Sequence, residues 1–219
     1  MYDWLDDIWQ LAGSTADPEA FALAPAGATN PELAEVEQPL GISLPPSYAV
    51  FLRRWNGATL QGSRILSTGE LLDFARRWGF RPYQGEVALA GPSGQHAYAA
   101  MPAHFLVFRT SDLGSDVDCF DTRPVAGGEY PVCHYDPETD DEDNLKPRFP
   151  SFEALLLYEI LGLLGDPVIF EDWSDEAGDE AAEQLFAAVA EWEQRLQATL
   201  EERGADLSEP IRPNWSAWH

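Results

Sequence analysis

The chain has 219 residues, 45% of them hydrophobic, so it can bury a substantial core and is not a disordered chain. It carries 38 acidic and 13 basic residues, and the resulting net charge of −25 repels polyphosphate. We therefore expect no direct binding to nucleic acid or to an anionic membrane surface, since both need clustered Lys and Arg. A basic protein is the natural partner, although an acidic proteome would also account for the charge.

The amino terminus and the cysteines indicate a cytoplasmic protein. Residues 1–13 are acidic and lack the basic start and small-residue cleavage site of a secretory signal. No stretch approaches the roughly twenty apolar residues of a membrane span. We expect Cys119 and Cys133 to be reduced core residues, because two cysteines in that compartment do not make a disulfide framework.

The first forty residues predict two short helices joined by a linker. Trp and Leu at helical spacing in residues 1–12 indicate a short amphipathic helix. Residues 13–29 are rich in small residues, Pro and Gly, and are interpreted as a linker. Asn30 is expected to cap a helix that stops before Pro39.

The segment 40–57, LGISLPPSYAVFLRRWNG, contains a helix start, an apolar face and a helix stop. Two prolines precede an apolar stripe at i, i+3, i+4 and i+7. The pair Asn56-Gly57 predicts a left-handed stop. The residues of the stripe are Tyr48, Phe51, Leu52 and Trp55.

The next forty-odd residues predict a strand, a helix and a loop. The run 58–66 suits a strand, Thr68 caps an amphipathic helix that reaches Trp78, and Gly79 ends that helix. Residues 82–103 lack steady periodicity and predict a loop with one short strand.

Residues 104–164 contain the clearest strand pattern. Apolar or alternating runs at 104–110, 117–121 and 129–135 predict an antiparallel meander. A charged loop follows at 136–144, and residues 152–164 predict a helix.

A long amphipathic helix is expected from about residue 179 to residue 203. We favour packing of its apolar face back on the domain over a role in partner binding, because the pattern is too short for a heptad repeat. The expected fold class is α+β, with a twisted, mainly antiparallel sheet flanked by helices and an added C-terminal helix. The residues on the apolar face are Leu185, Val189, Trp192, Leu196 and Leu200.

Three separated motifs resemble the SUKH superfamily of SMI/KNR-like domains. The first is segment 40–57, which resembles the pattern LG..LP..Y..FL...NG. The second is FRTSDLGSDVDCFDT with the following YPVCHYD, although Leu113 and Ser115 depart from a glycine-rich turn. The third is the closing helix FPSFEALLLYEIL.

The resemblance implies a SUKH-like domain over residues 30–165, with residues 1–29 as a helix and linker before it. Residues 166–219 would then be an acidic, helical C-terminal extension. Proteins of this superfamily are common among bacterial immunity proteins, which bind toxins that include nucleases and deaminases.

The sequence offers little support for catalysis or for a bound cofactor. Ser93 and His96 stand in GPSGQH, which is not a nucleophile elbow. The pair Cys133-His134 has no second ligand pair at zinc spacing, and the loop from Asp136 lacks the central Gly and final Glu of an EF-hand. No phosphate-binding glycine motif occurs. We expect a non-enzyme without metal or cofactor, in which such histidines are structural.

An acidic surface is the remaining candidate site. Between residues 112 and 143 the sequence has eleven acids and one base, Arg123, so this stretch is either a solvated hairpin rim or a docking surface for a cationic cleft. Two tyrosines could supply the anchors that interfaces favour. The predicted partner-binding residues are Asp112, Asp116, Asp118, Asp121, Tyr130, Tyr135, Asp136, Glu138, Asp140, Asp141, Glu142 and Asp143.

The leading hypothesis is an immunity protein that binds and neutralises a cognate toxin with a basic surface. The alternative is a regulatory scaffold that binds cellular proteins, as other SMI/KNR-like proteins do. A hydrolytic or metal-dependent enzyme is the third hypothesis, and it predicts bound metal or an activity that depends on His96 or His134.

Overall fold

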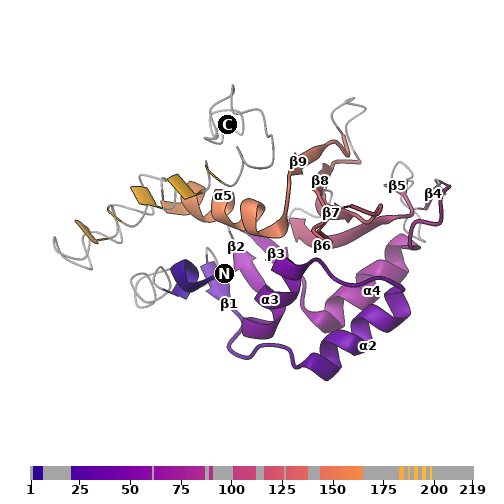
Figure 1. Cartoon of the computed structure of the whole chain (residues 1–219), viewed down its shortest axis with the longest axis horizontal. Coiled ribbons are helices and arrows are strands. Elements are labelled where there is room, and N and C mark those ends of the chain that lie inside the picture. Colours follow the sequence, from indigo (N-terminus) through magenta and orange to yellow (C-terminus); the bar gives the residue numbers. More distant parts are fainter. Residues whose placement is uncertain are drawn as a thin grey trace. The chain divides into compact units, whose positions relative to one another are not determined.

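The structure of the protein is a computed structural model, shown in Figure 1. It describes residues 2–6, 21–60, 62–86, 89–90, 101–111, 116–125, 127–137 and 144–164, and eight positions between 183 and 198. The chain forms two compact units: one comprises residues 18–152, and the other comprises residues 1–17 and 153–219.

A seven-stranded antiparallel sheet is the centre of the unit formed by residues 18–152. The strand order is β1-β2-β3-β6-β7-β8-β9, so strands that follow one another along the sheet are mostly hairpin neighbours. Two further strands, β4 (Leu89–Ala90) and β5 (Met101–Pro102), form a separate ribbon. The strands of the main sheet are β1 (Phe21–Leu23), β2 (Ala58–Leu60), β3 (Ser63–Ile65), β6 (Phe105–Ser111), β7 (Val117–Asp121), β8 (Val132–Tyr135) and β9 (Pro147–Phe149).

The first helix of this unit, α2 (Asn30–Leu40), begins and ends differently from the prediction. Thr29, not Asn30, is the N-cap, and its side chain and that of Glu32 make a reciprocal capping box. The helix also continues through Pro39, because a proline in the last turn forfeits only one backbone hydrogen bond. Gly41, in the left-handed region at φ 68°, ends it.

Helix α3 (Pro46–Arg54) supplies the predicted aromatic face. The Tyr48 ring lies 5.3 Å from that of Phe120 and 4.9 Å from that of Phe152, and its hydroxyl donates to the Leu66 carbonyl at 2.7 Å. The chain leaves the helix in extended conformation at Trp55 (φ −136°, ψ 107°), and the positive φ expected at Asn56-Gly57 comes just after this cap, at Gly57 (φ 116°).

The segment before α2 approaches the end of α3 closely. A Cβ on Gly27 would lie 1.8 Å from the carbonyl oxygen of Arg53, so only glycine fits there. The neighbouring Ala28 amide donates to the Leu52 carbonyl at 2.7 Å. The region interpreted as a linker therefore contains an edge strand, β1, and a close backbone contact.

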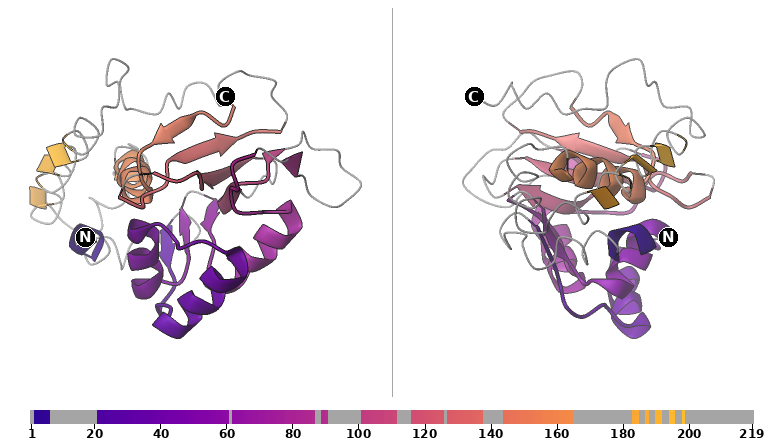
Figure 2. Two further views of the ribbon diagram at one scale, coloured as in Figure 1. Left: turned by 45° about the vertical axis from the view of Figure 1, so that its right-hand side comes forward. Right: turned by 90° about the vertical axis from the view of Figure 1, so that its left-hand side faces the viewer.

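Helix α4 (Thr68–Trp78) matches its predicted range, but its cap is Ser67. The Ser67 and Glu70 side chains form a second capping box, and Gly79 is the left-handed C-cap at φ 68°. Figure 2 shows α2 and α4 side by side next to the sheet.

Strand alternation separates two faces of the sheet. Asp118 and Phe120 of β7 point to one face, where Phe120 meets Tyr48 of α3. Cys119 points to the other face, as does Tyr135 of β8, which meets Trp78 of α4. Helices α3 and α4 thus cover opposite faces, and the predicted meander of β6, β7 and β8 is confirmed.

In the other unit, residues 3–6 are helical and α5 (Phe152–Leu164) covers the predicted helix. The described positions between 183 and 198 are helical and exposed, whereas the predicted apolar face of that helix lies outside the described residues. The α+β class with an added C-terminal helix is confirmed. No helix in the described part of the chain is long and apolar enough to cross a membrane.

Candidate partner-binding site

The hairpin order brings two acidic connections to the same end of the sheet. Val117, the first residue of β7, lies opposite Thr110 of β6 and opposite Tyr135, the last residue of β8. The β6–β7 and β8–β9 connections therefore leave neighbouring strands at one end. We call them the acidic connections. They hold Asp112, Asp116, Asp136, Glu138, Asp140, Asp141, Glu142 and Asp143 against a single base, Lys146, which directly precedes β9.

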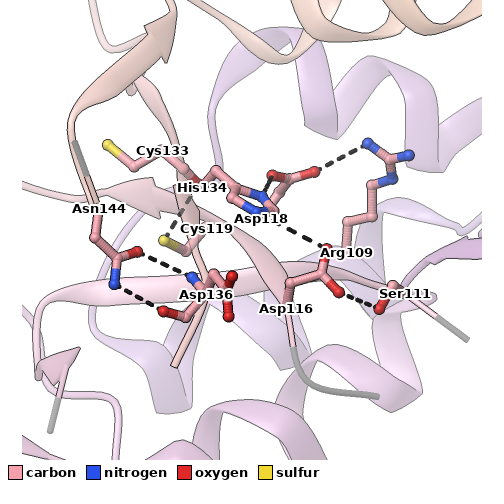
Figure 3. A network of polar contacts seen from close by, with 9 residues as sticks. All are labelled: Arg109, Ser111, Asp116, Asp118, Cys119, Cys133, His134, Asp136 and Asn144. Carbon is pink, nitrogen blue, oxygen red and sulfur yellow. Dashed lines mark hydrogen bonds and ion pairs between the residues drawn. The ribbon is translucent and has the colours of Figure 1, made fainter. Parts of the chain in front are cut away.

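A chain of polar contacts fixes the strands beneath this end (Figure 3). Asp118 lies between Arg109 of β6 and His134 of β8, with one oxygen 2.9 Å from the guanidinium and the other 3.0 Å from Nδ1. A bulge at Phe108 places Arg109 opposite Asp118. Burial would raise the pKa of Asp118, but the hydrogen bond from His134 and the charge of Arg109 outweigh it and hold that pKa below its usual value.

Asp116 extends this series of polar contacts to the edge of the site. The Ser111 hydroxyl donates to one of its oxygens, and the other lies 3.8 Å from Nε2 of His134. His134 thus has a carboxylate on each side of its ring. The exposed fractions of the Asp116 and His134 side chains are 33% and 23%, so both reach solvent.

Asn144 closes the β8–β9 connection. Its side-chain oxygen accepts from the Asp136 amide at 2.9 Å, and its side-chain nitrogen donates to the Asp136 carbonyl at 2.8 Å. The next residue, Leu145, has a left-handed backbone at φ 63°, and its amide donates to the His134 carbonyl at 2.9 Å. Both ends of this connection are therefore held in place.

The structure divides the twelve predicted residues among several places. Asp116, Asp118, Tyr135 and Asp136 lie at or near the end with the acidic connections, whereas Asp121 and Tyr130 lie toward the opposite end of the strands. The other six predicted residues fall outside the described part of the chain: Asp112, Glu138, Asp140, Asp141, Glu142 and Asp143.

Two of the predicted residues are committed to internal contacts. Asp121 is buried and accepts two hydrogen bonds at 2.9 Å from Nε of Arg123, one on each oxygen. Tyr135 is 2% exposed, and its ring meets that of Trp78 edge-on at 6.0 Å. Their side chains support the sheet from within.

The candidate reactive groups are placed for structure. Burial raises the pKa of Cys133 to about 12 and that of Cys119 well above its usual value, so both thiols stay protonated. Alternation puts Cys133 and His134 on opposite faces. Among the described residues, no group of three or more His, Cys, Asp or Glu side chains could hold a metal ion. Ser93 and His96 lie outside the described residues.

Three residues of the site were missed by the sequence reasoning: Arg109, Ser111 and Asn144. A charged residue within the apolar run 104–110 was the available signal for Arg109, because such a residue in a buried strand needs a partner. An Asn at the end of an acidic run is a common loop-closing residue.

Residues 27–157, more than half of the chain, match the SMI1 / KNR4 family (SUKH-1). The chain belongs to this family. The predicted SUKH membership is confirmed, and the SMI1/KNR4 match extends from the segment before α2 into α5, including both acidic connections. No curated protein matches the chain.

Proposed function

We propose that this SMI1/KNR4 protein is a bacterial immunity protein that binds a cognate toxin and neutralises it without catalysis. A toxin that acts on nucleic acid, such as a nuclease or a deaminase, has a basic cleft for phosphates. An acidic protein can occupy that cleft directly. Family membership supports a protein-binding role of this kind.

The acidic connections carry the proposal. Eight carboxylates and only one base, Lys146, lie in two connections that leave the sheet from adjacent strand ends. Self-repulsion makes such a concentration unfavourable in the free protein. A cationic partner relieves that repulsion, which gives the free energy of docking a clear source.

The internal contacts separate the roles of the twelve residues. We propose that the acids of the two connections face the toxin, whereas Tyr130, toward the opposite end of the strands, lies away from that face. Asp118 and Tyr135 hold the strands from inside, and Asp121 holds their far end. Replacing residues of this second group would then change the stability of the free protein more than the toxin contacts.

The charges would act mainly on the association rate. Complementary fields raise association rate constants from roughly 10⁵–10⁶ to as much as 10⁸–10⁹ M⁻¹s⁻¹ at low salt. In physiological salt the Debye screening length is about 8 Å, so the long-range attraction that steers the two proteins together is weaker. The account therefore predicts association that slows steeply as salt is added, with dissociation controlled by buried contacts.

The chemistry of the described residues supports binding rather than turnover. The two thiols are buried and protonated, and His134 already contacts two carboxylates. A nucleophile needs an exposed, activated group beside a base. The polar chain of Figure 3 supplies rigidity to the strand ends instead.

The first test is co-purification with the product of the neighbouring gene, which the proposal expects to be the toxin. We expect a one-to-one complex in which the toxin is inactive. If the neighbouring product neither binds nor is inhibited, while cellular proteins co-purify reproducibly in its place, the regulatory scaffold becomes the better account.

A further inference from the structure

His104 is a buried imidazole that makes no hydrogen bond to any residue the structure describes. It stands in the turn before β6 and is 4% exposed. Within the described ranges both ring nitrogens lack a hydrogen-bond partner, and an Asp121 oxygen lies 3.5 Å from Nε2. A buried polar group in this state costs free energy that its surroundings must offset.

The carboxylate beside His104 already has a cation. Arg123 donates to both oxygens of Asp121 through its guanidinium, and its backbone amide donates to one of them at 3.1 Å. The Arg123 side chain is 53% exposed, whereas His104 and Asp121 have almost no contact with solvent. An imidazolium at His104 would therefore compete with a guanidinium that has easy access to water.

The other described groups around His104 offer no second anion. The Tyr83 ring meets the imidazole edge-on at 5.4 Å, and the Phe105 ring lies at 4.6 Å. Cys133, which senses the charges of Asp121 and Arg123, is a protonated thiol. Burial lowers the pKa of His104; the Asp121 charge, the next largest influence, raises it, and the Arg123 charge adds a smaller lowering, so the pKa stays below its usual value.

The backbone at this point joins three segments. The His104 carbonyl accepts from the Thr122 hydroxyl at 2.7 Å and from its amide at 3.2 Å. Thr122 and Arg123 begin the β7–β8 connection. Further along, Glu129 accepts from the Ser47 amide and hydroxyl at the start of α3, each at 2.7 Å. Movement at His104 is thus linked to the connection that caps α3.

We propose that His104 is an acid-sensitive latch: when neutral it keeps Arg123 on Asp121, and when protonated it displaces Arg123 and loosens the β7–β8 connection. The proton comes from solvent and stays on the ring, which then pairs with Asp121. Arg123 moves into water because it is the exposed member of the two cations. The connection can follow, since Gly127 and Gly128 have open space around them and glycine accepts a wider range of backbone conformations than other residues.

This latch is independent of toxin binding, so it is tested on the full chain alone. The ring signals of His104 and the amide exchange of Thr122 and Arg123 are followed by NMR from pH 7.5 to 4.5, with exchange corrected for its intrinsic pH dependence. We expect His104 to protonate below its usual pKa of about 6.5. The corrected exchange rate of the Arg123 amide should be at least about tenfold higher at pH 5 than at pH 7.

Two exposed arginines provide the variant and its control. Arg123→Gln removes the competing cation, so His104 should protonate at higher pH and acid should no longer speed exchange at Thr122. Arg81→Gln removes the same charge from an arginine without a side-chain contact to Asp121 and should behave as wild type. The latch is refuted if Arg123→Gln leaves the His104 titration unchanged, or if His104 protonates while amide protection stays constant.

Discussion

The pair Arg109–Asp118 allows a quantitative test of the polar chain beneath the acidic connections. Their contact measures 2.9 Å, and only 11% and 12% of the two side chains are exposed. Removing one member of a buried pair typically costs about 3–5 kcal/mol, because the other charge is left without its partner. Here Asp118 keeps its hydrogen bond to His134. We therefore expect Arg109→Met to lower the free energy of unfolding by about 2–3 kcal/mol.

A double-variant cycle isolates the interaction itself. Arg109→Met combined with Asp118→Leu removes both charges, so its loss should be smaller than the sum of the two single losses by about 2 kcal/mol. Urea unfolding followed by tryptophan fluorescence at pH 7 measures all four proteins. A loss below about 0.5 kcal/mol in both single variants, or additive losses, would refute the reasoning.

The pH dependence of the same pair has a definite sign. The folded-state pKa of Asp118 lies below its unfolded value. At acidic pH, Asp118 therefore binds fewer protons on average in the folded protein than in the unfolded protein. The stability that it contributes is present above about pH 4 and is lost as the pH falls below that value. Arg109→Met should reduce this acid-dependent loss relative to wild type.

Three further predictions concern the core. Gly27→Ala should lower the free energy of unfolding by about 3 kcal/mol, because the added Cβ would clash with the backbone of α3. Gly69→Ala is the control: it has open space in the first turn of α4 and should be neutral or slightly stabilising. Equal effects of the two substitutions in thermal unfolding would contradict the packing. Tyr48→Phe should cost about 1–2 kcal/mol in urea unfolding because it strands a buried backbone carbonyl, and an unchanged midpoint would show that the bond contributes nothing. Cys119 and Cys133 should react with iodoacetamide at pH 8 at least about 100-fold more slowly in the folded protein than in urea, and comparable rates would show that the strands open readily.

Apolar spacing predicted the helices from the sequence, but choosing the N-cap residue also required the spacing of the capping box. At both Thr29-Asn30 and Ser67-Thr68 two neighbouring residues could cap the helix. The structure uses the first of each pair, the one with a Glu three residues later. Applying the capping-box spacing would have given the right residue in both cases.

The outer strands β1 and β9 could not be predicted in the same way. Each has three residues, and neither alternates apolar with polar side chains over a useful length. Their strand conformation is stabilised by backbone pairing with β2 and β8. The intrinsic strand propensity of three residues carries no information about such pairing. The sequence therefore indicated the central meander but not how far the sheet extends.

The candidate site was predictable in composition and less so in arrangement. Nearness along the chain grouped Asp121 and Tyr130 with the acids of the two connections. Antiparallel pairing sends the start and the end of each strand to opposite ends of the sheet, which separates these two residues from the others. The ion pair of Asp118 with Arg109 joins residues of different strands, and only the register at the β6 bulge reveals it.

The most direct test of the central claim is the association rate with the cognate toxin as a function of salt, measured by stopped-flow fluorescence. One variant converts Asp140, Asp141, Glu142 and Asp143 to Asn or Gln. The control makes the same change in net charge on the exposed acids Glu32, Glu35, Asp73 and Glu86. Our account predicts that the first variant loses at least about tenfold in association rate at low salt and most of its salt dependence, while the control keeps both. Equal behaviour of the two variants would contradict docking through the acidic connections.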